Sequence, residues 1–380
     1  MSAPLKCFAI AAPGLEPLLE AELRELSIKC KAVTGGVEWA GSESSVAIAN
    51  LWSRLASRVV VRIGEFRARS FFELERHAKK VEWDKYLAPG AQVQFRVTAR
   101  KSKLYHTGAI EQRLQEAIAR KVGRDIVIAG GSDDEDDTAA NAQLFVVRFE
   151  RDAAVISADT SGELLHRRGY RQAIAKAPLR ETLAAAMLRG AEWTGKTPLV
   201  DPMCGSGTIP IEAAMIARKI APGLDRSFAF LGWPGADVTR WKSLVEHARS
   251  QVLAKSPVAI AGSDRDAGAI EASRSNAERA GVTDDIQFAV KAISGAVPVG
   301  TGPGLLIMNP PYGERIGESD AIRNLYAQAG NVARGNFDGW TFAMLSPNKV
   351  LEGQTRLALE EQFKTSNGGI PVRLVAGPIE

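Results

Sequence analysis

Hydrophobic and polar residues alternate along the chain in a way that predicts three consecutive α/β segments. The first opens with an apolar run over residues 5–11. Leucines then recur at helical spacing over residues 14–26, with glutamates on the opposite face. Short extended runs over 28–33 and 37–40 flank the turn signal Gly35-Gly36. This order predicts a small unit of one helix and three strands, which we place at residues 1–43.

The second segment repeats the pattern at a larger scale, and we place it at residues 44–158. Its alternation predicts helices over 46–56, 71–81 and 110–122, and strands over 59–63, 93–99, 126–129, 144–149 and 153–158. The last two strands are expected to pair as a hairpin. An acidic run, Asp133–Asp137, precedes them and is typical of a solvated loop rather than an active site.

The third segment, residues 159–380, alternates strands with longer helices. Strands are predicted over 198–201, 258–262, 286–290, 305–308 and 340–345, and helices over 183–193, 209–220, 267–280 and 321–333. Such alternation is typical of a doubly wound parallel sheet. A hairpin around Asn367-Gly368-Gly369 would add an antiparallel strand at the end. An insertion over residues 222–241, rich in Phe and Trp, fits either a packing plug or a substrate lip.

The composition excludes several classes of protein. Hydrophobic residues make up 45% and charged residues 24% of the chain, and the mean hydropathy is −0.09, as in soluble globular proteins. The sequence has no apolar run long enough for a membrane span, and the run Cys7–Ala12 is too short for a signal peptide. Three widely spaced cysteines and four scattered histidines offer no metal-ligand spacing. We therefore expect a reduced, cytoplasmic protein without a structural metal.

Positive charge is concentrated in one part of the chain. The net charge is only +4, yet residues 51–125 hold 17 Lys and Arg against 8 Asp and Glu. A local excess of this kind indicates a surface for a polyanion such as a nucleic acid, although a solvated basic face is the simpler alternative. The candidate contacts are Arg100, Lys101, Lys103, Arg113, Arg120 and Lys121.

A glycine-containing loop follows the first strand of the third segment. It reads Asp201-Pro202-Met203-Cys204-Gly205-Ser206-Gly207 and leads into a helix. The two glycines permit a sharp turn and a close approach to a ligand, and the helix start offers free N–H groups. The spacing matches neither a dinucleotide nor a triphosphate fingerprint. The carboxylate before the loop suits a ligand with an ammonium group, such as S-adenosylmethionine. Cys204 is expected to be a packing residue.

The next strand ends in Gly262-Ser263-Asp264-Arg265-Asp266. An acidic side chain at the end of the second strand can accept hydrogen bonds from ribose hydroxyls, and we assign that role to Asp264. Asp266 more naturally caps the helix that follows it.

The most specific motif, Asn309-Pro310-Pro311-Tyr312, follows the apolar run 305–308. The prolines fix the backbone and offer carbonyl acceptors without N–H donors. The Asn side chain adds another acceptor, and Tyr312 adds a flat face for a flipped base. An exocyclic nucleobase amine needs such a set, because its lone pair is delocalised into the ring. A proline-rich turn with a packed Tyr is the alternative.

These motifs together resemble those of the THUMP-domain class I methyltransferases, and most closely the bacterial 23S ribosomal RNA guanine-N2 methyltransferases. The resemblance also covers Phe8–Leu26, Leu165–Arg171, Ala177–Leu183 and Phe337–Trp340. It implies a ferredoxin-like unit at 1–43, an RNA-binding THUMP domain at 44–158 and a Rossmann-like methyltransferase domain at 159–380. The loop from Asp201 to Gly207 would then bind S-adenosylmethionine, and Asn309–Tyr312 would hold the target base.

One position departs from the family pattern. After the third strand the family often has an acidic residue that contacts the adenine amine, whereas this chain has Ala292. Three rival functions remain open from the sequence. They are a guanine-N2 methyltransferase of tRNA, an adenine-N6 methyltransferase of DNA, and a non-catalytic RNA-binding assembly protein. The target nucleotide and the oligomeric state do not follow from the sequence.

Overall fold

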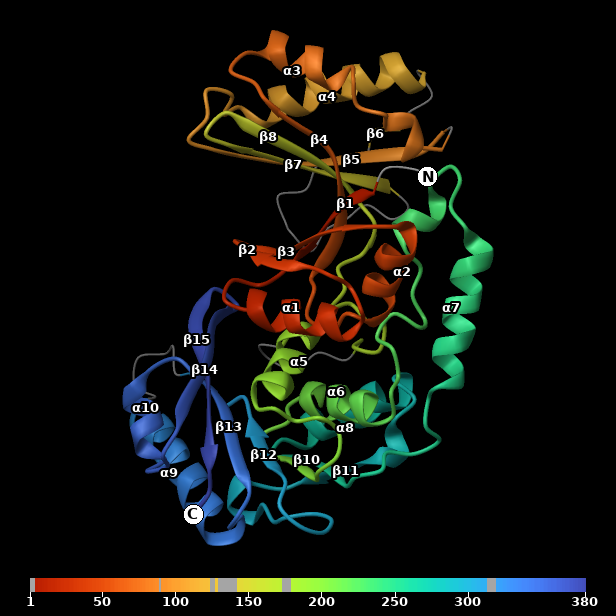
Figure 1. Ribbon diagram of the computed structural model, residues 1–380. Helices are drawn as coiled ribbons and strands as arrows, with labels where there is room; N and C mark the ends of the chain where they lie inside the picture. Colours follow the sequence, from red (N-terminus) through yellow and green to blue (C-terminus); the bar gives the residue numbers. More distant parts are fainter. Residues whose placement is uncertain (1–3, 89, 124–126, 129–141, 173–178, 313–318) are drawn as a thin grey trace.

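The computed structural model describes residues 4–88, 90–123, 127–128, 142–172, 179–312 and 319–380 (Figure 1). The acidic run at 133–137 lies outside these residues, as do parts of the predicted strand at 126–129. The described chain forms two β-sheets, which we call the N-terminal sheet and the C-terminal sheet. No helix among the described residues is both long enough and apolar enough to cross a bilayer.

The N-terminal sheet has eight strands in the order β2-β3-β1-β4-β8-β7-β5-β6. The strands are β1 (Leu5–Ile10), β2 (Lys31–Val33), β3 (Gly36–Gly41), β4 (Arg58–Arg67), β5 (Gln92–Arg100), β6 (Val127–Ile128), β7 (Ala142–Glu150) and β8 (Ala153–Asp159). The helices are α1 (Glu16–Glu25), α2 (Glu43–Trp52), α3 (Phe71–Ala78) and α4 (Thr107–Val122). Helices α3 and α4 cover one face of the half that contains β4, β5, β7 and β8 (Figure 1).

Strand β4 joins two units that the sequence pattern places apart. Its first residues pair with β1, from Arg58↔Ile10 to Arg62↔Lys6, and its later residues pair with β8. Val60 to Arg62 pair with both neighbours, and the pairing with β8 then shifts register between Arg62 and Gly64. The predicted boundary at residue 43 therefore falls inside one continuous sheet. Strand β4 has ten residues and is long enough to pair with strands of both units. The hydrophobic pattern of a single strand does not show which strands it pairs with.

The C-terminal sheet has seven strands in the order β11-β10-β9-β12-β13-β15-β14. These are β9 (Leu199–Asp201), β10 (Ile260–Asp264), β11 (Ile286–Val290), β12 (Leu305–Met308), β13 (Thr341–Ser346), β14 (Glu360–Asn367) and β15 (Ile370–Pro378). Strands β9 to β13 pair in parallel, whereas β15 pairs antiparallel to β13. This is the expected Rossmann-like α/β fold with an antiparallel terminal hairpin, so the predicted fold class is confirmed.

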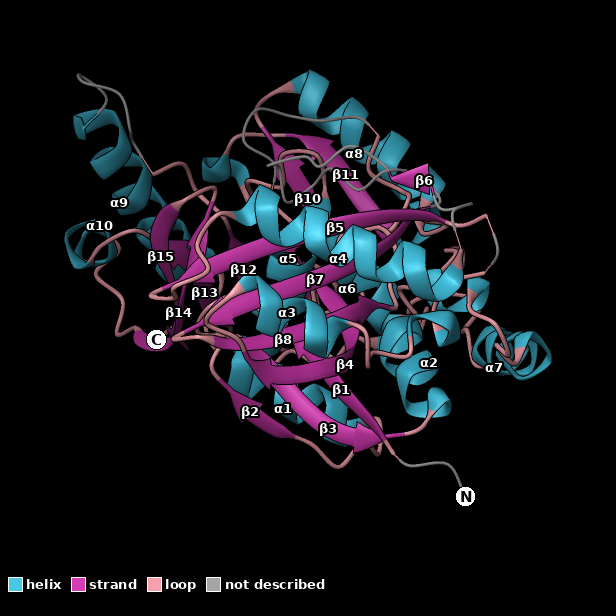
Figure 2. Cartoon of the chain, turned by 90° about the horizontal axis from the view of Figure 1, so that it is seen from above, coloured by secondary structure: helices cyan, strands magenta, loops and turns pink. Residues whose placement is uncertain are grey.

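Helices pack on both faces of the C-terminal sheet, as Figure 2 shows. They are α5 (Glu181–Gly190), α6 (Thr208–Ala217), α8 (Ala267–Arg279), α9 (Ser319–Asn336) and α10 (Lys349–Gln354). Helix α7 (Val238–Ser250) instead lies at the side of the molecule, next to α2 (Figure 1). Strand β12 is buried over its whole length, as expected for a central parallel strand. The pattern did not predict α7 or α10. Most of the α7 surface is polar or exposed, so its apolar periodicity is weak.

The insertion over residues 222–241 packs against the N-terminal half. Phe228 and Trp241 are buried and meet edge to face, with ring centroids 5.2 Å apart. The indole N–H of Trp233 donates to the side-chain oxygen of Gln143 in β7 at 2.7 Å. The aromatic contact stabilises the insertion itself, and the Trp233 hydrogen bond ties the insertion to the N-terminal sheet. The packing interpretation of the insertion accounts for these residues.

Candidate active site

The sequence motifs of the third segment meet at the carboxyl edge of the C-terminal sheet. Strand β9 lies between β10 and β12, with Gly262 beside Asp201 and Leu306 beside Val200. The chain proceeds outward from β9 to β11 and then returns to β12 on the other side of β9. The strand order therefore reverses between β9 and β12. In open parallel sheets, ligands bind in the crevice outside the carboxyl ends at such a point.

The two glycines of the loop after β9 serve different purposes. Gly205 and Gly207 have positive φ angles of 54° and 85°, which favour glycine. A Cβ on Gly207 would come 3.0 Å from the Cβ of Ser273 in α8, so this glycine permits close packing of helix and loop. A Cβ on Gly205 would meet nothing within 4 Å. Gly205 therefore presents backbone to open space, where a ligand can approach it.

Asp201 holds an unpaired oxygen inside the protein. Its Oδ1 accepts a hydrogen bond from the Met203 amide at 3.0 Å. Its Oδ2 is buried and accepts none from the described part of the chain. Burial, reinforced by the nearby Asp264, raises the pKa of Asp201 to about 8. An orphaned buried carboxylate oxygen is costly unless a donor reaches it, so the site fits a ligand with a cationic N–H group.

Asp264 organises the loop from the neighbouring strand. Its Oδ2 accepts from the Gly205 amide at 3.1 Å, and its Oδ1 accepts from the Asp266 amide at 3.0 Å. Asp266 caps α8, because its Oδ1 accepts from the Gly268 amide at 2.8 Å. The predicted capping role of Asp266 is confirmed. Asp264 is half-buried and faces the loop, and carboxylate oxygens retain further lone pairs for a ligand hydroxyl.

The remaining residues of the loop pack against protein. Pro202 and Cys204 are buried, and Met203 is half-buried. The Cys204 amide donates to the Ser263 carbonyl at 2.9 Å. Burial raises the pKa of the Cys204 thiol, which disfavours the thiolate that a nucleophile requires. All three cysteines, Cys7, Cys30 and Cys204, are buried free thiols.

Two residues of α8 fix the loop and were missed by the sequence analysis. The Ser273 hydroxyl donates to the Gly205 carbonyl at 2.7 Å, and the Asn276 side-chain amide donates to the Ser206 carbonyl at 3.0 Å. Both side chains are fully buried. Polar residues three apart on one helical face are a weak signal for such a role.

The motif after β12 forms a hydrogen-bonded unit with the terminal hairpin. The Tyr312 hydroxyl donates to the Asn309 side-chain oxygen at 2.6 Å, and the Asn367 side-chain amide donates to the Tyr312 hydroxyl at 3.1 Å. Burial raises the pKa of Tyr312 to about 12, so its hydroxyl keeps its proton at neutral pH. Pro310 is buried and Pro311 is exposed.

Tyr312 therefore does more than offer an aromatic face. Its hydroxyl fixes the orientation of the Asn309 amide, because an amide oxygen with a bound donor keeps its second lone pair in a defined direction. The sequence pattern predicted only that Asn367 belongs to the turn of the terminal hairpin. Its contact with Tyr312 arises because β14 carries it to the motif across 55 residues of chain.

Ala292 follows β11 at the same edge and is exposed. It offers a methyl group where the family often has a carboxylate. Its neighbour Lys291 is held by a hydrogen bond from its amide to the Asp264 carbonyl at 2.8 Å. Either a backbone group contacts the adenine amine in place of the carboxylate, or the affinity for the cofactor is reduced, and both alternatives remain predictions.

A buried charge cluster connects this site to the N-terminal half. Glu212 in α6 is fully buried and lies 2.8 Å from Arg168 Nε and 3.5 Å from Arg54 Nη1. The Tyr170 hydroxyl donates to Glu212 Oε1 at 3.1 Å. Arg54 follows α2, so the carboxylate of one helix pairs with cations from two other segments. Glu212 lies in the helix that follows the glycine loop, and the sequence pattern gave no indication of its partners.

The structure places the six predicted nucleic-acid contacts in two groups, one at the end of β5 and one on α4. Arg100, Lys101 and Lys103 lie together at the end of β5 and in the loop after it. Arg113 sits in the middle of α4 and pairs with Glu75 at 3.2 Å. Arg120 pairs with Glu116 at 3.3 Å, and Lys121 is beside it at the far end of the helix. A helix of this length separates its ends by roughly 20 Å.

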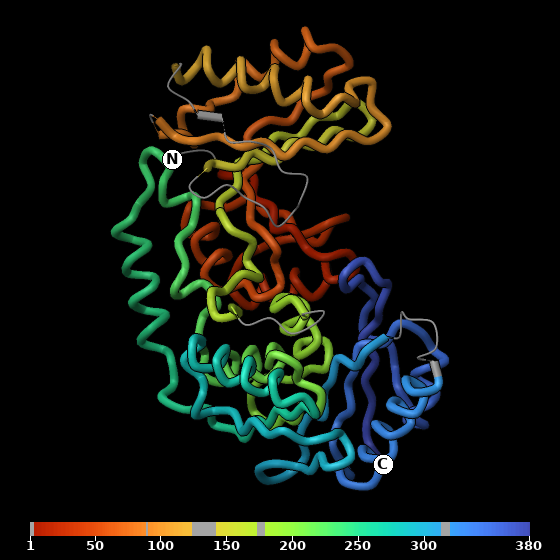
Figure 3. Tube along the Cα trace, turned by 180° about the vertical axis from the view of Figure 1, so that it is seen from behind, coloured from red at the N-terminus to blue at the C-terminus, as the bar shows by residue number. Residues whose placement is uncertain are grey.

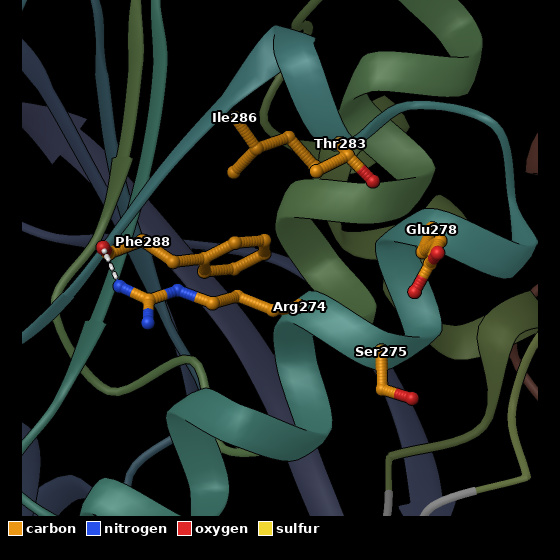
Figure 4. Close-up of a pocket in the computed structure, with 6 residues that line it drawn as sticks. All are labelled: Arg274, Ser275, Glu278, Thr283, Ile286 and Phe288. Carbon is orange, nitrogen blue, oxygen red and sulfur yellow. Dashed lines mark hydrogen bonds between the residues drawn. The ribbon is translucent and has the colours of Figure 1, made fainter.

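A separate hollow of about 470 Å³ lies on the outer side of the C-terminal sheet, between α8 and β11. Figure 4 shows its lining residues, with Arg274 donating to the Phe288 carbonyl at 3.0 Å. None of the predicted cofactor or base residues lines it. Among the described residues, no three His, Cys, Asp or Glu side chains are grouped to hold a metal ion.

Two family matches cover most of the chain. The family described as "RMKL-like, methyltransferase domain" matches residues 168–376, and the "RlmL ferredoxin-like domain" matches residues 6–60. The second match extends beyond the predicted boundary at residue 43 and ends within β4.

Two curated relatives resemble nearly the whole chain. The ribosomal RNA large subunit methyltransferase K/L of Syntrophotalea carbinolica is 38% identical over 387 residues, which cover 99% of this chain and 54% of that protein. The chain thus spans about half the length of that relative. A putative RNA methyltransferase of Synechocystis sp. is 36% identical over 372 residues, covering 97% of this chain and 95% of that protein.

Solved structures give a similar picture. A putative methyltransferase complexed with SAH (SMU.472) is 31% identical, has a TM-score of 0.88 and is matched over 100% of this chain and 99% of its own. A predicted N6-adenine-specific DNA methylase from Listeria monocytogenes is 32% identical with a TM-score of 0.86, over 97% and 95% of the two chains.

Proposed function

Because the chain belongs to the RMKL-like methyltransferase-domain family, we propose that it transfers a methyl group from S-adenosylmethionine to RNA. The proposed acceptor is the exocyclic N2 amine of a guanine in 23S ribosomal RNA. The observation that carries the proposal is the pair of motifs at the strand reversal. The glycine loop with the orphaned Asp201 oxygen follows β9, and Asn309–Tyr312 follows the adjacent strand β12.

The cofactor assignment rests on the fit of this loop. Asp201 Oδ2 would accept from the ammonium group of S-adenosylmethionine, and the Gly205 backbone would lie against the ligand. Asp264 would hold ribose hydroxyls with the lone pairs that the loop leaves free. A solved relative complexed with SAH has the same fold over the full chain, which supports this choice.

The bound cofactor would supply a methyl carbon that its sulfonium makes electrophilic. Asn309 and the Pro310 carbonyl would accept hydrogens from the acceptor amine, which orients its lone pair toward that carbon. Transfer would exchange the C–S bond of the cofactor for a new N–C bond, with the acceptor amine giving up a proton to solvent. Holding both partners in place can contribute roughly 7–11 kcal/mol in favourable cases. A strong general base is unnecessary, because methylation makes the amine acidic.

The RNA assignment rests on the relatives and on the basic stretch of the N-terminal sheet. Both curated relatives bear names of RNA methyltransferases. The THUMP identity of residues 44–158, and their role in holding RNA, are part of this proposal. The domain division at residues 43 and 158 remains a prediction as well.

An adenine-N6 methyltransferase of DNA is the second candidate. One structural relative is titled a predicted N6-adenine-specific DNA methylase, and the acceptor set at Asn309 suits either exocyclic amine. A guanine-N2 methyltransferase of tRNA would also use this set.

One experiment separates these functions. The protein is incubated with labelled S-adenosylmethionine and with unmodified 23S RNA, tRNA or DNA, and the products are digested to nucleosides for mass spectrometry. We expect N2-methylguanosine from 23S RNA, and loss of the product with Asn309→Ala. N6-methyladenine from DNA, or methylation confined to tRNA, would overturn the 23S assignment. If the protein binds S-adenosylmethionine but none of the nucleic acids becomes labelled, the proposed methyltransferase activity is wrong.

A further inference from the structure

One end of the N-terminal sheet gathers cationic and aromatic side chains. Strands β4, β5 and β7 run in the same direction, and β8 runs against them. Pairing therefore places four residues in one row across the sheet. Arg67 is opposite Ala153, Ala153 is opposite Glu150, and Glu150 is beside Arg100. The loops after β4 and β5 and the turn between β7 and β8 consequently emerge together.

Asp152 ties these three connections to one another. Its Oδ1 accepts from the Lys103 amide at 2.8 Å, and its Oδ2 accepts from Arg69 Nε at 3.2 Å. Its own amide donates to the Ser102 hydroxyl at 3.0 Å, and its carbonyl accepts from the Ala68 amide at 3.0 Å. The Lys103 amide and then Arg69 hold the pKa of Asp152 below its ordinary value. We call this region the Asp152 end.

The backbone at the Asp152 end is strained. Lys101, Arg151 and Asp152 adopt positive φ angles of 50°, 50° and 64°, although none of them is a glycine. Such conformations are unfavourable for residues other than glycine and persist where surrounding contacts determine them. The contacts of Asp152 do so here. As a result, Lys101 and Arg151 are held in fixed directions at the surface, and both are exposed.

Cations predominate at the Asp152 end. Arg67, Arg100, Lys101, Lys103 and Arg151 are exposed, and within the described residues no carboxylate is ion-paired with any of them. Arg69 pairs with Asp152. By contrast, Arg113 and Arg120 on α4 are paired with glutamates, so their charge is already balanced.

Two large aromatic side chains stand out into solvent beside these cations. Phe72 in the first turn of α3 is 75% exposed, and Tyr105 just before α4 is 65% exposed. The Tyr105 ring lies over His106, with centroids 4.2 Å apart. Helix α3 starts soon after the end of β4 and α4 soon after the end of β5, so both N-termini lie at this end, and the Glu75–Arg113 ion pair joins the two helices. Isolated apolar residues are common on surfaces, but two aromatic rings on an ordered cationic end are not explained by packing.

We propose that the Asp152 end binds an unpaired segment of RNA, with phosphates on its cations and one base stacked on Tyr105. Exposed aromatic rings bind bases by their flat faces, which are accessible only when the base is not stacked in a duplex. Phe72 is placed to contact a neighbouring base. The identity of the polymer rests on the proposed function, while the surface is argued from its own geometry.

The position of this end suits a substrate that also reaches the candidate active site. Figures 1 and 3 both place the turns at the end of β4, β5 and β7 on the side of the molecule where β13, β14 and β15 lie. The terminal hairpin, whose Asn367 contacts Tyr312, and the Asp152 end thus lie on the same side of the molecule.

Binding of a labelled oligoadenylate of about twelve nucleotides, within the site sizes of single-strand binders, tests the proposal. Its affinity is measured by fluorescence anisotropy between about 50 and 200 mM salt. Tyr105→Ala should weaken binding about tenfold, because loss of one stacked base costs 1–3 kcal/mol. Tyr105→Phe should stay within about twofold of wild type, because the ring face remains.

The charged residues should produce a different signature. The double variant Arg100→Gln, Lys103→Gln should lower the salt slope by about 1.4, at roughly 0.7 per lost phosphate contact. Tyr105→Ala should leave that slope unchanged. Lys80→Gln, an exposed lysine beyond the far end of α3, is the matched charge control and should change neither quantity.

Several outcomes would overturn the proposal. The proposal would be wrong if the wild type did not bind oligoadenylate, or if Tyr105→Ala bound it with unchanged affinity. It would also be wrong if Tyr105→Ala lost as much affinity for an RNA duplex of the same length as for oligoadenylate. Equal competition by oligoglutamate would instead indicate an acidic protein partner. Oligoadenylate contains no guanine, so these results are independent of methyl transfer. A failure of the proposed activity would appear only in the nucleoside analysis.

Discussion

The carboxyl edge of the C-terminal sheet and the Asp152 end of the N-terminal sheet are built in opposite ways. At the carboxyl edge the polar groups are buried and hold one another, as Ser273 and Asn276 hold the glycine loop. At the Asp152 end the charges are exposed, and a single carboxylate orders the backbone beneath them. A small ligand that must react needs atoms fixed in position, whereas a charged polymer needs mainly surface charge.

This difference predicts how each region responds to change. Substitutions at the carboxyl edge should alter stability or chemistry with little dependence on salt, because buried groups are weakly screened. Substitutions at the Asp152 end should alter affinity, and those of its cations should alter the salt slope. The three predictions below test the first half of the comparison, in order of decreasing effect.

The largest effect is expected at Glu212. Glu212→Ala should lower the free energy of unfolding by about 3–5 kcal/mol, because Arg168 would remain buried without a compensating charge. Urea denaturation with circular dichroism measures this. Glu246→Ala, at an exposed position of α7, is the matched control and should stay within about 0.5 kcal/mol of wild type. A loss at Glu212 as small as that of the control would show that the two sheets do not depend on this cluster.

A smaller effect, on the rate, is expected at the motif after β12. Asn309→Ala should lower kcat about 10–100-fold, since a hydrogen bond to a group that becomes charged contributes roughly 1.5–3 kcal/mol. Tyr312→Phe removes the hydroxyl that orients Asn309 but keeps the ring. Its loss should be about 2–10-fold, as for a neutral hydrogen bond.

Single-turnover methyl transfer to 23S RNA measures both variants. Their RNA affinity and its salt slope should match wild type, which separates this edge from the Asp152 end. Equal losses of rate in the two variants would mean that the contribution of Asn309 depends entirely on its orientation by the Tyr312 hydroxyl. A wild-type rate in Asn309→Ala would remove Asn309 from the mechanism.

The smallest effect concerns the pH dependence of cofactor binding at Asp201. Its folded pKa of about 8 lies above the ordinary value of 3.8, so the ionised form is disfavoured and stability should fall as pH rises from about 4 to 8. The ammonium of S-adenosylmethionine requires the ionised form. Its affinity should therefore rise with pH, by at most about tenfold between pH 6 and 7, and level off above pH 8.

Isothermal titration calorimetry of S-adenosylmethionine across this pH range checks the prediction, and proton release should accompany binding below pH 8. Asp201→Asn should bind more weakly at pH 8 and lose the rise with pH. A parallel rise in the Asn variant would assign the effect to another group.

The sequence by itself determined the strands, most of the helices and the motifs of the C-terminal sheet, although not α7 or α10. Strands such as β12, and helices such as α8 with its Asp266 cap, follow from local periodicity and from hydrogen bonds between near neighbours. The strand–helix alternation also gave the parallel topology, because connections of that length permit few others. For the same reason the glycine loop and the Asn309 motif could be placed at one edge before the structure was known.

Tertiary structure alone decided the contacts between residues that are distant in sequence. Strand β4 became the shared member of two units, Asn367 reached Tyr312 across 55 residues, and Glu212 found its arginines in two other segments. It also divided the basic residues, leaving Lys103 at the Asp152 end and pairing Arg113 with Glu75. These outcomes depend on which elements pack together, and the free energy of packing belongs to pairs of surfaces that no local pattern contains.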